Sequence, residues 1–189
     1  MFNLIKNLFS KNSKLEKKQN DYNEISINKD AIEQKFFNQM LNKNEYLCKE
    51  KKEEIFKVYK HQINLLDGTP LTKEEKQELG LNVRMKITKE YVELFNKNKI
   101  KEINPKDELQ RFIASVISRV NAEISVLKCK NAGIQEMELC SAIGDCDWCR
   151  KLENKILPID EVLELVKNPQ CTCRYSLLTR PIIEFDEDN

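Results

Sequence analysis

One stretch of this sequence repeats apolar residues at helical spacing for about five turns. Asn104-Pro105 precedes it, a typical helix start because Asn caps helices and proline fits their first turn. Asn131-Ala132-Gly133 follows as a stop signal. The stripe consists of Leu109, Phe112, Ile113, Val116, Ile117, Val120, Ile124 and Leu127, and the charged residues mostly off it are Arg111, Arg119 and Glu123. We therefore predict one long helix at the core of the fold.

The residues before this stretch predict several further helices. Thr72 and Glu75 have the spacing of a capping box, and Gly80 can end the short helix that they start. The segment 67–70 predicts a turn, and another helix should cover 91–95. Two longer apolar runs have helical spacing: Ile32, Phe36, Phe37, Met40 and Leu41, then Leu47, Ile55, Val58, Tyr59, Leu65 and Leu66. We expect these runs to form a helical body over 28–133.

The composition argues against several classes of protein. Charged residues make up 33% of the chain and hydrophobic residues 40%, which favours a water-soluble, surface-rich protein over a membrane protein. The formal net charge is +1, so a nucleic-acid partner would need a local basic patch. The lysine runs at 49–52 and 96–101 are interleaved with Glu or Asn and are typical of solvated faces, which supports a nucleic-acid role only weakly.

The first 27 residues favour a cytoplasmic protein. Asn3 and Lys6 interrupt the apolar residues near the start, and no small-residue cleavage site follows, so export and membrane spanning are not predicted. We interpret 1–27 as a flexible lead-in with a frayed or docking helix. The alternative is a short amphipathic helix that touches a membrane or partner through Phe2, Leu4, Ile5, Leu8 and Phe9.

The pattern changes after Gly133. Short strands are predicted within 134–143 and 176–183, a turn-like segment at 144–152, and a helix over 158–166. The predicted fold is mainly α: a helical body followed by a small α+β C-terminal module stapled by zinc. The predicted regions are a flexible lead-in (1–27), the helical body (28–133), a cysteine-rich zinc-binding module (134–183) and an acidic tail (184–189).

Four cysteines in that module predict a structural zinc site. Cys146 and Cys149 form a C-x-x-C turn, and Cys171 and Cys173 form a C-x-C pair after 21 intervening residues. Four thiolates arranged as a tetrahedron suit Zn²⁺, and a module of about 50 residues commonly needs such a staple. Cys140 is an alternative ligand. An iron–sulfur cluster, a redox pair or no metal at all remain alternatives.

Sequence motifs typical of catalytic sites are missing from the chain. His61 is the single histidine and lies in a polar stretch, so a nucleophilic triad has little support. Phosphate-binding, dinucleotide-binding and H-E-x-x-H motifs do not occur. Four thiolate ligands would leave a zinc ion no open position for a substrate, so we expect a protein that is not an enzyme.

A run of residues from Arg119 onward resembles the C-terminal part of phage Mu F-like minor head proteins, the head-morphogenesis family. The run comprises Arg119, Glu123, Asn131-Ala132-Gly133-Ile134, Asp145-Cys146-x-x-Cys149, Asn154-Lys155, Pro169 and Cys173-Arg174. It covers about a third of the chain. In the closing motif Tyr175 stands in place of a cysteine of the family, and Cys171 stands near its histidine, where a thiolate can take over as ligand.

The resemblance implies a minor capsid or head-assembly protein encoded by a phage or prophage. Its partners would be portal or capsid proteins or further copies of itself, and it would be cytoplasmic or associated with the virion. The alternative is a cytoplasmic zinc-binding adaptor or regulator that contacts protein or nucleic acid.

Overall fold

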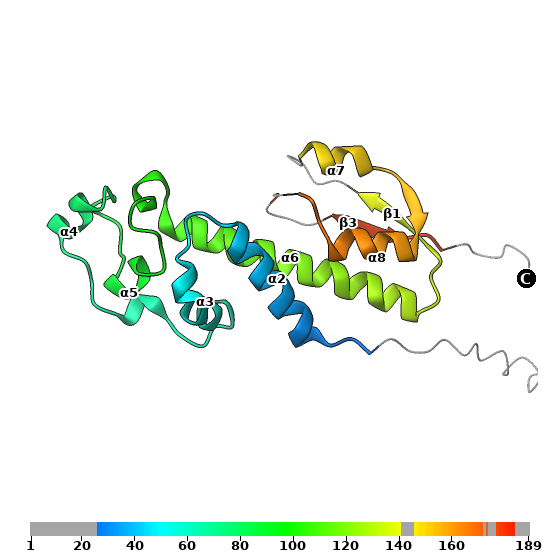
Figure 1. The fold of residues 1–189 in the computed structure, drawn as a ribbon, viewed down its shortest axis with the longest axis horizontal. Helices are drawn as coiled ribbons and strands as arrows, with labels where there is room; N and C mark the ends of the chain where they lie inside the picture. The colour runs from blue at the N-terminus through cyan, green and yellow to red at the C-terminus, as the bar shows by residue number, and fades with distance from the viewer. Residues whose placement is uncertain (1–25, 141–145, 172, 174–176, 184–189) are drawn as a thin grey trace, which may run out of the picture.

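The longest helix, α6 (Pro105–Asn131), forms the axis of an elongated molecule (Figure 1). The computed structural model describes residues 26–140, 146–171, 173 and 177–183. The Asn104 side chain accepts a hydrogen bond from the Lys106 amide at 3.0 Å, and Pro105 occupies the first turn. Gly133, with φ +82°, follows the C-terminal end in the left-handed conformation that glycine adopts without strain. The predicted long helix is confirmed.

The buried face of α6 differs from the predicted apolar stripe. Arg119 is 1% exposed and Glu123 is also buried, whereas Ile117 is 40% exposed. The buried face therefore keeps most of the stripe but is shifted to one side of it, toward a polar row at i, i+4 spacing formed by Ser115, Arg119 and Glu123. The prediction that Arg119 and Glu123 lie outside the buried face was wrong, because an earlier segment, α2, supplies a partner for Glu123 and a later one, Cys171 and Cys173, supplies acceptors for Arg119.

Helix α2 (Lys29–Lys43) packs along α6. Asn28 caps it by accepting a hydrogen bond from the Ala31 amide at 3.0 Å. The ring of Phe37 meets the ring of Phe112 on α6 edge to face, with centroids 5.5 Å apart. Lys35 on α2 pairs with the buried Glu123, so the polar row of α6 has a partner on this side.

The segment between α2 and α6 is more irregular than predicted. The run expected to be helical as far as Leu66 contains α3 (Lys52–Tyr59), which ends where His61 adopts φ +56°. The capping box of Thr72 and Glu75 is confirmed. The other elements of this segment are η1 (Lys49–Lys51), η2 (Leu65–Asp67), α4 (Lys73–Glu78), α5 (Lys89–Val92) and η3 (Ile100–Glu102).

The C-terminal part contains a small antiparallel sheet of strand order β2-β1-β3. Met137 and Leu139 of β1 are fully buried and alternate with more exposed neighbours, as a strand with one covered face requires. In the register, Met137 lies opposite Leu157 of β2, and Leu139 lies opposite Thr179 of β3. The strands are β1 (Glu136–Cys140), β2 (Ile156–Pro158) and β3 (Leu178–Pro181).

Two helices accompany the sheet. α8 (Ile159–Lys167) packs on α6 and confirms the helix predicted over 158–166. α7 (Asp147–Leu152) occupies most of the segment predicted to be turn-like, so the backbone over 147–152 is more regular than predicted. The mainly helical fold with a small C-terminal sheet and a cysteine cluster is confirmed.

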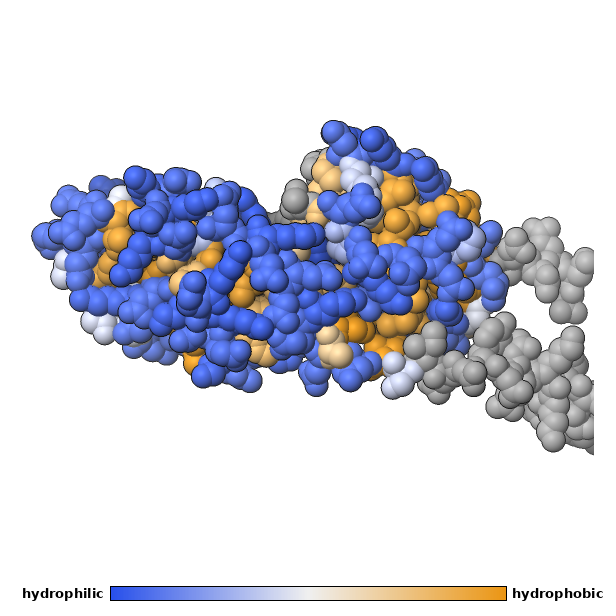
Figure 2. Space-filling model, in the orientation of Figure 1, coloured by the Kyte–Doolittle hydropathy of each residue, from blue (hydrophilic) through white to orange (hydrophobic). Residues whose placement is uncertain are grey.

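One apolar core joins the two predicted parts. Phe112 and Val116 of α6 belong to the same buried cluster as Leu139 of β1 and Val162 and Val166 of α8. The division at residue 133 stays a prediction about folding units, but the packing is continuous across it. More of the visible surface is hydrophobic around α8 and the sheet than over α2 (Figure 2).

The predictions for the chain ends fall largely outside the described residues. Of the lead-in, only 26 and 27 are described, and the acidic tail 184–189 is outside. None of the helices in the described ranges combines the length and apolar character needed to cross a bilayer.

Truncation of Phe112 tests the packing at the centre of the fold. Phe112→Ala removes a buried ring that contacts Phe37, so it should lower the free energy of unfolding by about 3–5 kcal/mol. Ile117→Ala on the same helix is the control, because its side chain is partly exposed. Urea denaturation followed by circular dichroism measures both. Equal losses would contradict the observed orientation of α6.

Candidate metal centre

The first cysteine pair is placed by the start of α7. Cys146 is the residue before the helix, and Cys149 lies one turn later, so both side chains occupy the same side of the turn. The Arg150 amide donates to the Cys146 carbonyl at 3.0 Å and closes the turn. Cys149 is buried, while Cys146 is half-buried.

The second pair is brought to the first across the loop that contains β2 and α8. The Cys146 amide donates to the Cys173 sulfur at 3.2 Å, which links the two pairs directly. The sulfurs of Cys146, Cys149 and Cys173 all lie within 4.8 Å of one another. Ligand sulfurs of a tetrahedral zinc site are about 3.8 Å apart, given Zn–S bonds of about 2.3 Å. The three cysteines are therefore positioned to bind a metal ion.

Cys171, the fourth predicted ligand, lies beside this group but is not a member of it. It is buried in the same small apolar cluster as Cys149 and Leu177. Its thiol interacts with that of Cys149, which contributes to a raised Cys149 pKa. The structure thus brings three of the four predicted ligands together and places the fourth against them.

The thiols have different electrostatic surroundings. Backbone amides at the start of α7 lower the pKa of Cys146, because they donate hydrogen bonds to its sulfur. Burial raises the pKa of Cys149, and the neighbouring Cys171 adds to this effect. Burial also raises the pKa of Cys173, although the amide of Cys146 opposes it. A cation between the sulfurs would favour the thiolate forms, as metal binding by cysteine requires.

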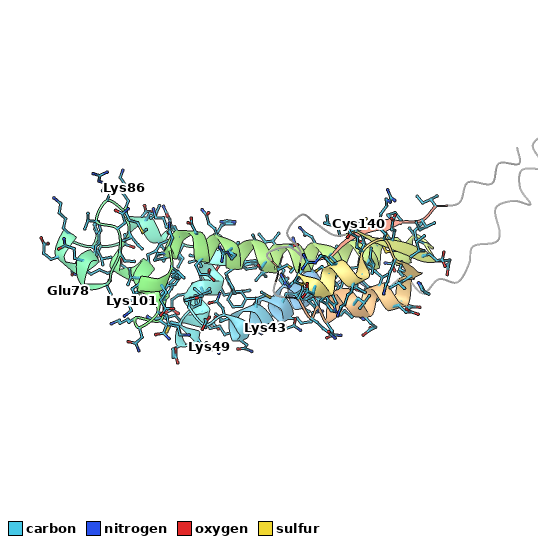
Figure 3. All side chains as sticks on the ribbon, turned by 90° about the horizontal axis from the view of Figure 1, so that it is seen from above. Lys43, Lys49, Glu78, Lys86, Lys101 and Cys140 are labelled. Atoms are coloured by element: carbon cyan, nitrogen blue, oxygen red, sulfur yellow. The ribbon has the colours of Figure 1, made fainter. Side chains whose placement is uncertain are left out.

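The remaining cysteines lie apart from the group. Cys140 ends β1, and its side chain is half-buried in the half of the molecule that carries α8 (Figure 3). Cys48 precedes η1, and its thiol donates to Glu50 at 3.1 Å. Cys129 is half-buried on α6. All seven cysteines are within the described residues, and each is a free thiol.

Trp148, between the first two cysteines, packs against the small cluster of Cys149, Cys171 and Leu177. It is half-buried and covers one side of that cluster. His61, the single histidine, is exposed, as its polar surroundings in the sequence suggest.

Arg119 belongs to this site, although its position beside the apolar stripe predicted neither its burial nor its contacts with the cysteines. One terminal nitrogen, Nη1, donates to the Ser115 carbonyl at 3.0 Å. The other, Nη2, donates to the carbonyls of Cys171 at 3.3 Å and Cys173 at 2.9 Å, and it lies 3.7 Å from the Cys171 sulfur. The sequence pattern that could have indicated its burial is the i, i+4 row of Ser115, Arg119 and Glu123 beside the apolar stripe. Such a polar row is consistent with a solvated helix flank as well as with a buried one.

No protein-family model, curated protein or solved structure matches this chain. The centre is therefore characterised by its own geometry: a cysteine cluster positioned to bind a metal ion, held against the central helix by a buried arginine.

Replacement of Cys149 tests the assignment of the centre. Cys149→Ser should lower the amount of metal bound by the purified chain, measured by elemental analysis. It should also speed amide hydrogen exchange in α7 and around Cys171 and Cys173, since these segments have few other contacts with the core. α6 and α8 should remain protected because they share the large core.

Cys48→Ser is the matched control for this experiment. Its thiol lies in the segment between α2 and α6, away from the cluster, so metal content and exchange rates should not change. The same loss of metal in both variants would contradict the site.

Proposed function

We propose that this chain is a non-enzymatic structural protein of phage head morphogenesis, minor capsid-like, in which one zinc ion staples the C-terminal module. The observation that carries the proposal is the convergence of Arg119 with Cys146, Cys149 and Cys173 at one centre. These residues belong to the run that resembles the Mu F-like minor head proteins, although 54 positions separate Arg119 from Cys173. Their convergence supports the interpretation of the run as a single structural motif.

Zinc suits the donor set better than other common ions. Cysteine sulfur is a soft ligand, and a set of thiolates favours Zn²⁺ or an iron–sulfur cluster over Mg²⁺ or Ca²⁺. The amide of Cys146 that donates to the Cys173 sulfur is the kind of outer hydrogen bond that orients a ligand. Cys146, Cys149 and Cys173 would hold the ion, and Cys171, next to Cys149, would complete four sulfur ligands.

A structural role follows from the number of sulfur donors. Four thiolates saturate a tetrahedral zinc ion, so no position remains for a substrate or an activated water. The ion would instead fix α7 and the second cysteine pair against the rest of the fold. These segments share only a small apolar cluster, which makes them the part of the chain that gains most from a staple.

An apolar groove beside the central helix supports assembly with other proteins. The groove has a volume of about 490 Å³ and lies between α6 and β3. Ile117 of α6 and Leu178 of β3 line it, and both side chains are exposed. The buried face of α6 is shifted to one side of the apolar stripe, which leaves Ile117 at the surface beside the groove. Exposed apolar surface of this kind is typical of protein–protein contacts.

The alternative, a zinc-binding adaptor or regulator, would share the same centre and differ in its partner. An adaptor that binds nucleic acid would need a cluster of unpaired basic residues on its surface. Several lysines of the segment between α2 and α6 pair with carboxylates: Lys51 with Glu93, Lys89 with Glu75, and Lys99 with Glu45. Glu78 lies at the same end of the molecule as Lys86 and Lys101 (Figure 3). This mixture of charges favours a protein partner.

Co-expression with the portal and capsid proteins encoded beside this chain tests the proposal. Affinity purification should recover a complex, and Ile117→Asp or Leu178→Asp should weaken it at least about tenfold, because a carboxylate in an apolar contact loses its hydration. Ile63→Asp is the control, since Ile63 is about as exposed as Ile117 but lies outside the groove. The proposal fails if the chain neither associates with these proteins nor with itself.

A further inference from the structure

The charge of Arg119 has no carboxylate partner in the part of the chain that the structure describes. The side chain is almost completely buried on α6. Among the described residues, its acceptors are three backbone carbonyls and one sulfur, and its Nε atom has no hydrogen-bond partner there. Carbonyls satisfy the N–H groups but do not neutralise the charge. Burial of an uncompensated charge is costly, so this arrangement needs a source of negative charge nearby.

A loaded cysteine centre would be such a source. Four thiolates around a divalent ion carry two net negative charges. The Nη2 atom of Arg119 is already 3.7 Å from the Cys171 sulfur, so the guanidinium would lie directly against that complex. The guanidinium would then have a negative counter-charge inside the protein, and it would offset one of the two negative charges of the complex.

Arg119 also positions the second cysteine pair. Nη2 donates to the carbonyls of both Cys171 and Cys173, and so restrains both residues of the pair. Cys173 in turn accepts the hydrogen bond from the Cys146 amide. A continuous set of contacts therefore runs from α6 through Arg119 to the second pair and then to the first.

We infer that Arg119 is a positioning residue of the metal centre, which holds Cys171 and Cys173 in their binding geometry and offsets part of the charge of the metal–thiolate complex. This inference rests on the metal binding proposed above and adds a residue that is not itself a ligand. It ties metal affinity to the central helix, because the arginine belongs to the most extensively packed element of the fold.

The two effects of Arg119 can be separated with two substitutions in the full chain. Arg119→Met keeps an unbranched apolar side chain, shorter than that of arginine, and removes both the charge and the hydrogen bonds. Arg119→Lys keeps the charge and loses the planar fork that reaches three carbonyls. Arg111→Met is the matched control, because Arg111 lies on the same helix with an exposed side chain that pairs with Glu108.

Affinity for Zn²⁺ is measured by competition with a chromophoric chelator, and Co²⁺ serves as the spectroscopic probe. Wild type and Arg111→Met should bind equally and show the same thiolate-to-cobalt charge-transfer band. Arg119→Met should bind Zn²⁺ about 10–100-fold more weakly, the usual cost of losing a group that orients a ligand. Its cobalt band should be weaker as well, since Cys171 and Cys173 are no longer held in place. Arg119→Lys should recover part of the affinity.

The metal-free proteins distinguish this role from a general contribution to folding. Without metal, the charge of Arg119 lacks compensation, so Arg119→Met should have a urea midpoint equal to or above that of the wild type. A fall in the midpoint that matches the fall in affinity would assign Arg119 a structural role only and overturn the inference.

Equal Zn²⁺ affinity in Arg119→Met and wild type would overturn it too. An Arg119→Lys affinity no better than that of Arg119→Met would overturn the role of the arginine charge. A wild-type chain that binds neither ion would overturn the proposed metal function itself.

Discussion

The burial of one polar row on α6 is the constraint on which the rest of the structure depends. Ser115, Arg119 and Glu123 lie inside the protein, and segments distant in sequence supply partners for the two charged residues. Lys35 of α2 pairs with Glu123, and the carbonyls of the second cysteine pair accept from Arg119. The same helix thus links the helical body to the cysteine centre through charged groups as well as through apolar packing. Buried charged groups demand defined partners, so they restrict how the two parts can be arranged.

The arrangement also accounts for the exposed apolar surface. α6 has more apolar residues around its circumference than its neighbours in the described residues cover, since the polar row occupies part of the buried face. Ile117 is left at the surface as a result, next to Leu178 of β3. The metal centre and the proposed docking groove are therefore two consequences of one rotation of the central helix. A partner that binds in the groove would contact the strand that follows the second cysteine pair.

Local signals in the sequence predicted much of the fold and part of the site. The caps at Asn104 and Thr72, and the turn-length spacing of Cys146 and Cys149, depend only on neighbouring residues, and the structure confirms them. The rotation of α6 could not be predicted, because it depends on which residues from 171 onward reach the helix. The end of α3 at Tyr59 was missed because the apolar pattern continues beyond it while the backbone turns at His61. Cys171 was grouped with the other ligands by spacing, and spacing does not distinguish a sulfur inside the group from one beside it.

The long sequence separations at the centre determine the order in which the chain can fold. The segment that accepts from Arg119 follows it by more than 50 residues, so during synthesis α6 emerges well before its cysteine partners. α2 emerges earlier than α6 and can pack against it at once. The guanidinium of Arg119 stays hydrated until Cys171 and Cys173 have been synthesised and can accept its hydrogen bonds. Closing a loop of this length has an entropic cost that is repaid only when the contacts form. During synthesis the cysteine centre can thus form only after both α2 and α6 have emerged, so its closure comes at the end of the chain's maturation.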